Sequence, residues 1–181
     1  TDTRLTDENI NKPALFTIVR SFDINRPKTK DVKGGVVGGT LLQGTLRVGD
    51  MIEIRPGIKD DQGRIRPLLT TVTSLFSDDT PLETAFPGGL IAIGTTLDPY
   101  FTASNALVGK VAGHPKSIPP SYRHCKLHFR HFNRHDKNKV SMSSVNEDIL
   151  VTVNASSVIG KIMNVDRSKK EIIVFLRESV C

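Results

Sequence analysis

Four closely spaced histidines are the first residues whose type and spacing could support chemistry. They occur at intervals of four, three and four residues and are His124, His128, His131 and His135. On a helix this spacing would place all four imidazoles on one face, where they could bind zinc. The residues between them favour a strand, because Cys125, Leu127 and Phe129 alternate with basic side chains until His131 breaks the pattern. We therefore predict a solvated basic strand and no metal site.

A glycine-rich stretch at residues 33–40, Lys-Gly-Gly-Val-Val-Gly-Gly-Thr, superficially resembles a phosphate-binding loop. Such a loop requires a lysine and a serine or threonine directly after its last glycine, at the start of a helix whose amides hold the phosphate. Here no lysine follows Gly39, and the next residues favour a strand. Glycines of this kind let barrel strands bend and coil. The sequence therefore predicts no nucleotide site in this stretch.

The sequence contains no recognisable catalytic constellation. It has no Gly-x-Ser-x-Gly turn, no His-Glu-x-x-His zinc motif and no cysteine with a credible histidine base. Asp78 and Asp79 precede Pro81 in a predicted turn, where solvated acids are commoner than acid–base catalysts. These observations favour a binding module over an enzyme.

Composition indicates a cytoplasmic protein. No apolar run approaches the roughly 20 residues of a membrane helix, and residues 1–11 do not resemble a signal peptide. Only two cysteines occur, Cys125 and Cys181, whereas a secreted disulfide framework would usually contain more. We expect neither membrane insertion nor export.

The chain is basic, which permits nucleic-acid binding without demonstrating it. Its 181 residues include 25 Lys and Arg against 19 Asp and Glu, which gives a net charge of +6. Lysines and arginines bind RNA by neutralising phosphates and releasing condensed counterions. The most basic segment spans residues 123–139, and its candidate RNA-facing residues are Arg123, Lys126, Arg130, Arg134, Lys137 and Lys139. A charged hairpin without a ligand would have the same composition.

Short apolar runs, broken about every ten residues by turn-forming residues, predict an all-β chain. The expected strands cover residues 14–20, 51–55, 70–76, 90–93, 106–112, 125–132, 148–154, 157–165 and 171–176. Alternation places Met51, Glu53 and Arg55 on one face of their strand and Ile52 and Ile54 on the other. Residues 58–66 are expected to form a polar loop with a turn at 61–63. The prolines in residues 113–121 mark a boundary between two antiparallel β domains.

Several motifs resemble one family closely. They are Ile-Val-Arg-Ser-Phe-Asp-Ile-Asn at 18–25, Val-Lys-Gly-Gly-Val-Val-Gly-Gly at 32–39, Val-Gly-Asp-Met-Ile-Glu-Ile-Arg-Pro-Gly at 48–57 and Pro-Gly-Gly-Leu-Ile-Ala-Ile-Gly-Thr-Thr-Leu-Asp-Pro at 87–99. Their order is that of the gamma subunit of eukaryotic and archaeal initiation factor two. The resemblance is strong over residues 13–112 and weaker beyond. The Val-Gly-Asp piece is shared by factors similar to elongation factor Tu, whereas the Arg-Pro-Gly and Pro-Gly-Gly-Leu-Ile motifs are more specific.

The resemblance implies an all-β fold of two elongation-factor-Tu-like β-barrel domains, the second truncated. In that family a GTP-binding domain precedes the two barrels. We accordingly expect a linker at residues 1–12, barrel domain two at 13–113, a proline-rich linker at 114–122 and an incomplete barrel domain three at 123–181. GTP and Mg²⁺ would bind the preceding domain, so the resemblance implies no cofactor, no metal and no enzymatic activity for this chain itself.

The resemblance also implies partners and contact residues. The partners are initiator methionyl-tRNA, the alpha and beta subunits of the same factor and the small ribosomal subunit, with no membrane. The candidate contacts for the tRNA end or the alpha subunit are Arg20, Arg47, Arg55, Ser74, Leu75, Phe76, Gly88 and Gly89. Phe76 offers a stacking face or belongs to the core, and the two glycines admit a terminal adenosine or simply make turns. The alternative identity is a related domain of another elongation-factor-Tu-like translation GTPase.

Overall fold

The structure is a computed structural model that describes residues 7–26, 30–130 and 144–181. It is built from β-strands, as the sequence predicts, with one short helix, α1 (Asp7–Ile10), and two 3₁₀ turns, η1 (Pro99–Phe101) and η2 (Ala103–Asn105). The chain divides into two compact units, and the main division falls between Pro120 and Ser121, inside the proline-rich stretch, while residues 154–156 and Cys181 group with the first unit. Over these ranges, no helix is long and apolar enough to cross a membrane.

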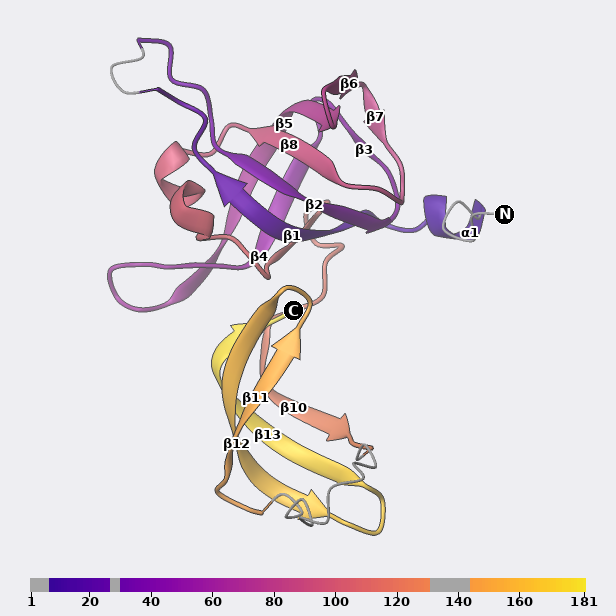
Figure 1. Ribbon diagram of the computed structural model, residues 1–181, viewed down its shortest axis with the longest axis vertical. Helices are drawn as coiled ribbons and strands as arrows, with labels where there is room; N and C mark the ends of the chain where they lie inside the picture. The colour runs from indigo at the N-terminus through magenta and orange to yellow at the C-terminus, as the bar shows by residue number, and fades with distance from the viewer. Residues whose placement is uncertain (1–6, 27–29, 131–143) are drawn as a thin grey trace, which may run out of the picture. The chain divides into compact units, whose positions relative to one another are not determined.

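The first unit is a closed antiparallel barrel (Figure 1). Six strands follow one another around it in the order β4 (Met51–Lys59), β9 (Val111–Gly113), β1 (Leu15–Phe22), β2 (Val36–Gln43), β8 (Ile91–Thr95) and β5 (Ile65–Ser77). β5 then pairs back with β4, which closes the ring. β6 (Thr80–Leu82) pairs antiparallel with the end of β5. β3 (Leu46–Arg47) and β7 (Thr84–Ala85) form a separate two-stranded sheet. Closure removes the free sheet edges that would otherwise invite association.

The barrel has one continuous apolar core. Alternate residues of each strand point inward, so that the register sets Ser21 opposite Val37, Val37 opposite Ile93 and Ile93 opposite Leu75, all four of them buried. The largest fully buried side chains of this core include Phe16, Ile18, Leu41, Ile52, Ile54 and Leu107. The residues one position along from the inward row therefore point to the outer surface, where a ligand can reach them.

The strand predicted at residues 106–112 is largely wrong. Only its end is a strand, β9, and it is preceded by consecutive turns. Ser104 and Asn105 have φ values of 53° and 60°, and Gly109 has a φ of 80°, so the chain repeatedly enters the left-handed region that strands avoid. Leu107 is nevertheless fully buried. The buried Leu107 lies in a turn, yet it gives residues 106–112 the apolar pattern that a strand would also have.

Glu53 is buried, although it lies on the face of β4 opposite Ile52 and Ile54. Glu53 is only 6% exposed, because β4 pairs with β9 at Gly113 and the chain that follows runs back over the Glu53 carboxylate. Glu53 Oε1 accepts a hydrogen bond from Arg55 Nε at 2.7 Å, and Glu53 Oε2 accepts one from the Lys116 amide at 3.1 Å. Arg55 is consequently paired and half-buried. An inward-outward alternation identifies only the core face of a strand, and the other face can be covered by a distant segment.

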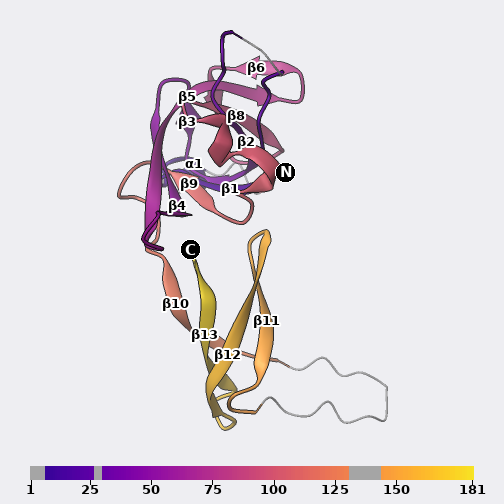
Figure 2. The ribbon, with the colours of Figure 1, turned by 90° about the vertical axis from the view of Figure 1, so that its left-hand side faces the viewer.

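The second unit is a four-stranded antiparallel sheet, visible as a single layer in Figure 2. Its strands run in the order β10 (Tyr122–His128), β13 (Glu171–Val180), β12 (Ser156–Asp166) and β11 (Asp148–Val153). One face carries an apolar cluster centred on Ile172, Val174 and Leu176, with Cys125 and Leu127 partly buried against it. Within the described residues this sheet is open, with β10 and β11 at its edges.

Candidate functional site

Two rows of side chains cross the outside of the barrel. The register sets Arg20 opposite Gly38, Gly38 opposite Ala92 and Ala92 opposite Phe76, on β1, β2, β8 and β5. The second row lies two residues away from the first on each strand and contains Phe22, Val36, Gly94 and Ser74. Both rows have their smallest residues near the centre and their largest at an end. Since neighbouring strands lie about 4.8 Å apart, β1 and β5 are separated by roughly 14 Å across these rows.

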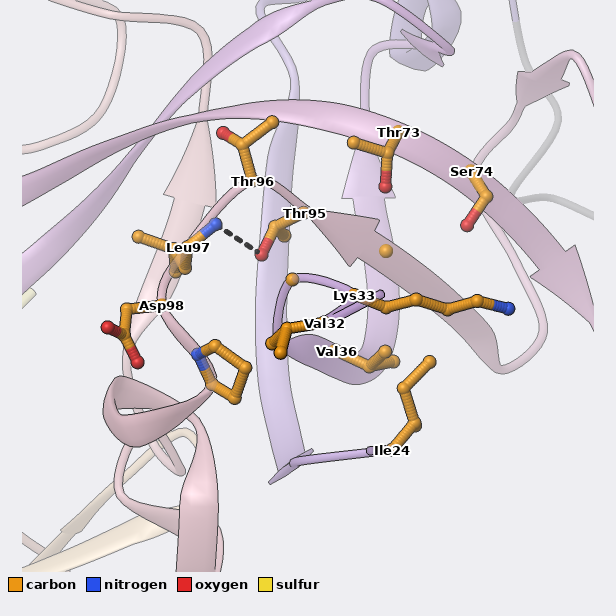
Figure 3. Close-up of a pocket in the computed structure, with 13 residues that line it drawn as sticks. Ile24, Val32, Lys33, Val36, Thr73, Ser74, Thr95, Thr96, Leu97 and Asp98 are labelled. Carbon is orange, nitrogen blue, oxygen red and sulfur yellow. Dashed lines mark hydrogen bonds between the residues drawn. The ribbon is translucent and has the colours of Figure 1, made fainter. Parts of the chain in front are cut away.

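A pocket of about 740 Å³ opens over the second row (Figure 3). Its walls combine apolar side chains with hydroxyl groups, and the lining residues are Ile24, Val32, Lys33, Gly34, Val36, Thr73, Ser74, Gly94, Thr95, Thr96, Leu97, Asp98 and Pro99. Lys33 extends along the side of the pocket on which Thr73 and Ser74 lie. The Thr95 hydroxyl already makes its hydrogen bonds within the barrel, because it donates to the Gly35 carbonyl at 2.6 Å and accepts from the Leu97 amide at 3.2 Å.

Several polar groups of the pocket and of the first row are available to a ligand. The hydroxyls of Thr73 and Ser74 and the Lys33 amine, which line the pocket, and the Arg20 guanidinium of the first row have no partner among the described residues. Phe76 is 37% exposed at the end of the first row. Two cations, two hydroxyls and one aromatic face can therefore bind a group that is both anionic and apolar.

The structure brings together three of the candidate residues predicted from sequence. Arg20, Ser74 and Phe76 lie on the two outer rows, although Arg20 is more than fifty residues from the others in the chain. The exposure of Phe76 excludes the alternative that this ring belongs to the core. Leu75 is the residue of this segment that points into the core, so its side chain is not a contact.

A second group of candidates lies at the loop that leads into β8. Gly88 and Gly89 have φ values of 118° and 60°, and no atom lies within 4 Å of a Cβ placed on either one. They form the turn that the sequence allowed, and they also leave open space above it. The Gly88 amide donates to the Leu41 carbonyl, so it is not free for a ligand. Arg47 is exposed on β3, opposite Thr84 of β7.

Arg55 joins neither group. Its guanidinium is held by Glu53 on the part of β4 that residues 113–118 cover. Of the three candidate arginines, Arg20 and Arg47 are exposed, whereas Arg55 is paired and half-buried.

The basic residues of the second unit lie partly within the described structure. Arg123, Lys126 and Arg130 are exposed there, while Arg134, Lys137 and Lys139 lie outside the described residues. The predicted alternation of β10 is confirmed, since Cys125 and Leu127 are half-buried between exposed basic neighbours. Lys126 Nζ lies 2.6 Å from Glu171 Oε2, and the Arg123 guanidinium lies 5.2 Å from the Phe175 ring centre.

Sequence reasoning missed one cation on the outer face of this sheet. Lys161 on β12 and His124 on β10 both stand opposite Phe175 of β13. The alternation of residues 157–165 was the available signal, but it does not say which distant strand lies alongside. His131 and His135 lie outside the described residues. In the part that the structure describes, no group of three or more His, Cys, Asp or Glu could hold a metal ion.

The barrel belongs to a recognised class of domain. Residues 34–112 match the family described as elongation factor Tu domain 2. Among solved structures, the bacterial selenocysteine-specific elongation factor EF-Sec aligns with a TM-score of 0.64 at 18% identity, over 97% of this chain and 25% of that one. At this identity the alignment establishes a shared fold.

Sequence similarity defines the particular family. The chain is 39% identical over 182 residues to translation initiation factor 2 subunit gamma of Methanopyrus kandleri, which covers 96% of the chain and 44% of the relative. It is 40% identical to the eukaryotic gamma subunit of Schizosaccharomyces pombe, over 87% of the chain and 38% of the relative. It is 54% identical over 113 residues to the Methanocaldococcus jannaschii subunit. The chain belongs to the initiation factor 2 gamma family and spans less than half the length of these relatives.

Proposed function

We propose that this chain acts in translation initiation, as the non-catalytic part of a GTP-dependent factor that helps to bind initiator methionyl-tRNA and docks the alpha subunit. The small ribosomal subunit and the beta subunit are further partners of the complete factor in this proposal. GTP and Mg²⁺ would act elsewhere in that factor. The family membership supports the setting, and the outer rows of the barrel support the contact with tRNA.

The pairing of a cation with an aromatic ring across a floor of small residues carries the tRNA proposal. Gly38 and Ala92 leave room between Arg20 and Phe76, and an ester-linked methionine with its terminal nucleotide is both apolar and anionic. A phosphate would approach Arg20 or Lys33, while Phe76 and Phe22 provide surface for the apolar side chain or the base.

The alpha subunit is proposed to dock beside this site. Val32 and Tyr100 are 64% and 80% exposed, and Ile24 is exposed near them. A hollow of about 500 Å³ lies between them, lined by Asp23, Asn25, Arg26, Val32, Asp98, Pro99, Tyr100 and Ala103. A cluster of exposed apolar residues with a polar rim is typical of a protein-binding surface.

The basic face of the second unit is proposed to meet RNA. Lys161 and Arg130 have no described carboxylate partner, whereas Lys126 is paired with Glu171. A surface of this kind binds weakly, and its affinity falls steeply as salt rises. We expect weak, salt-sensitive and poorly specific RNA binding by this chain alone.

Calorimetric titration with the C-terminal domain of the alpha subunit tests the docking proposal. Saturable one-to-one binding is expected, and Tyr100→Ala should weaken it while Lys116→Ala, at an exposed lysine outside the site, should not. Absence of binding by a folded chain would contradict the docking proposal and would favour another elongation-factor-Tu-like factor.

The tRNA proposal needs a separate measurement in the complete factor, assembled with GTP. Arg20→Glu and Phe76→Ala should each weaken binding of methionyl-initiator tRNA by roughly tenfold, the range for lost stacking or charge-assisted contacts. Lys116→Glu is the matched control for the charge change. Unchanged affinity in both site variants would remove the outer rows from the tRNA site.

A further inference from the structure

The hairpin that joins β4 to β5 extends outward from the barrel wall (Figure 1). Its turn is organised by one carboxylate. Asp60 Oδ1 accepts the amides of Gln62 at 3.0 Å and Arg64 at 2.9 Å, and Asp60 Oδ2 accepts Nε of Arg64 at 3.0 Å and Nε of Arg66 at 2.9 Å. The hydrogen bond from the Arg64 amide is the main cause that lowers the pKa of Asp60, so the carboxylate is ionised at neutral pH.

This geometry fixes two arginines side by side. Both guanidinium groups bond Asp60 through Nε, while their side chains remain 58% and 63% exposed. The two main-chain hydrogen bonds Asp60 N to Arg64 O and Gly63 N to Asp60 O, both 2.8 Å, hold the turn beneath them. A hollow of about 310 Å³ lies at this place, lined by Asp60, Asp61, Gln62, Arg64 and Arg66.

We propose that this arginine fork, formed by Asp60, Arg64 and Arg66, binds phosphate groups of an RNA backbone. Two guanidinium groups share the Asp60 carboxylate, so these three groups carry a net positive charge, and both arginine side chains are more than half exposed. Asp61 also lines the hollow. Arginine donors in a fixed planar arrangement match phosphate oxygens in pairs, and a side chain that is already ordered loses less entropy on binding. RNA is the polyanion favoured here because the proposal rests on the function proposed above for the chain.

The site differs from a merely basic surface in one testable respect. Asp60 lowers the local positive charge but also holds both arginines in place. If geometry matters, removing the Asp60 charge weakens RNA binding. If only net charge matters, the same change strengthens binding. The two expectations have opposite signs.

The experiment uses the 181-residue chain and a fluorescein-labelled RNA hairpin, with binding followed by anisotropy at several salt concentrations. Arg64→Gln and Arg66→Gln should each weaken binding about three- to tenfold and lower the salt dependence by about one counterion. Asp60→Asn should also weaken binding. Lys116→Gln, which removes one exposed charge elsewhere on the barrel, is the control and should have a smaller effect than either arginine change.

Arg64→Lys keeps the charge but loses the fork, so it should weaken binding even if Asp60→Asn disturbs the turn. Nuclear magnetic resonance adds a site-resolved readout, in which the Nε–H signals of Arg64 and Arg66 should shift as RNA is added. Tighter binding by Asp60→Asn with a folded hairpin, unchanged binding by Arg64→Lys, or stationary arginine signals would each overturn the proposal. Equal shifts caused by a poly-glutamate peptide would overturn the assignment to RNA. All these variants should dock the alpha subunit normally, so failure of docking is a separate result.

Discussion

The closed barrel and the open sheet contain similar strands with different degrees of burial. In the barrel, Phe16, Ile18 and Ile54 are fully buried, because pairing of β4 with β5 closes the sheet around them. In the second unit, Leu127 and Ile149 alternate with polar residues just as regularly but are only partly buried. The central strands of the open sheet bury Val174 and Leu176 completely, so the partial burial falls on its edge strands β10 and β11, and edge strands are what closure removes from the barrel.

The two units also contain contrasting ion pairs. Glu53 and Arg55 of the barrel are largely covered, whereas Lys126 and Glu171 of the sheet join an exposed lysine to a carboxylate near the surface. A covered carboxylate depends on its partners, because removing them leaves a charge without solvation. A pair with an exposed lysine contributes little, because water and salt solvate the Lys126 ammonium whether or not it is paired.

The largest expected difference concerns the two cores. Ile54→Ala in the barrel should lower the free energy of unfolding by about 4 kcal/mol, because it leaves a cavity in a closed core. Ile149→Ala in the sheet should cost about 1–2 kcal/mol, since the side chain is already partly exposed. Urea unfolding, monitored through nuclear magnetic resonance signals from each unit, measures the loss of stability in both variants. Equal losses would show that an edge strand of the open sheet buries its side chains as effectively as the closed barrel does.

The ion pairs provide the next test. Glu53→Ala should cost about 3 kcal/mol, because Arg55 and the Lys116 amide lose their acceptor in a covered place. Lys126→Ala should change the free energy of unfolding by less than about 1 kcal/mol. Glu53→Gln, which keeps an acceptor, should fall between them. Hydrogen exchange of the Lys116 amide reports the local effect, and continued protection in Glu53→Ala would contradict it.

Gly38 and Gly39 are adjacent on β2, and substitutions at them test the outer site and the core separately. A Cβ on Gly39 would collide with the Thr17 carbonyl, so Gly39→Ala should destabilise the barrel by about 2 kcal/mol. A Cβ on Gly38 would stand 3.7 Å from Arg20 Cβ, so Gly38→Ala should alter stability by less than about 1 kcal/mol. Thermal unfolding measures both, and Gly38→Val should then weaken methionyl-tRNA binding by the complete factor. Normal tRNA affinity in Gly38→Val would show that the floor of the first row is not occupied.

The smallest effects are expected at two hairpin turns, one in each unit. Asp60 accepts hydrogen bonds in the β4–β5 turn, and Asp166 accepts them from the Ser168 hydroxyl and the Lys169 amide in the β12–β13 turn. The hydrogen bond from Arg64 chiefly lowers the pKa of Asp60, and the one from the Ser168 hydroxyl chiefly lowers the pKa of Asp166.

A lowered carboxyl pKa stabilises the folded turn above its ordinary value of 3.8, and this contribution is lost as pH falls through the lower folded value. The Arg64 and Lys169 amide resonances should therefore shift only below pH 3.8, where protonation of each carboxylate destabilises its turn. Asp60→Asn should abolish the transition at Arg64 and leave that at Lys169 unchanged. A transition well above this value would contradict the assignment.

Local sequence patterns were sufficient for much of the fold. Residues 58–66 were expected to turn at 61–63, and β4 and β5 do reverse between Lys59 and Ile65. The all-β class, most strands and the family also follow from runs of residues and ordered motifs. These features depend on neighbours in the chain, which the sequence displays directly.

The candidate site was only partly visible in the sequence. Arg20, Ser74 and Phe76 could be named individually, but nothing in their spacing shows that they share an outer face. That follows from the strand order β1-β2-β8-β5 and from the register of each pair. The same reason explains why Lys161 was missed beside Phe175.

The sequence by itself determined which residues alternate, where the chain turns and which family it belongs to. Tertiary structure decided that the first sheet closes, that Glu53 is covered by residues 113–118 and that Arg20 stands across from Phe76. The physical reason is that alternation and turn preference are properties of adjacent residues, whereas strand order, register and covering depend on contacts between segments far apart in the chain.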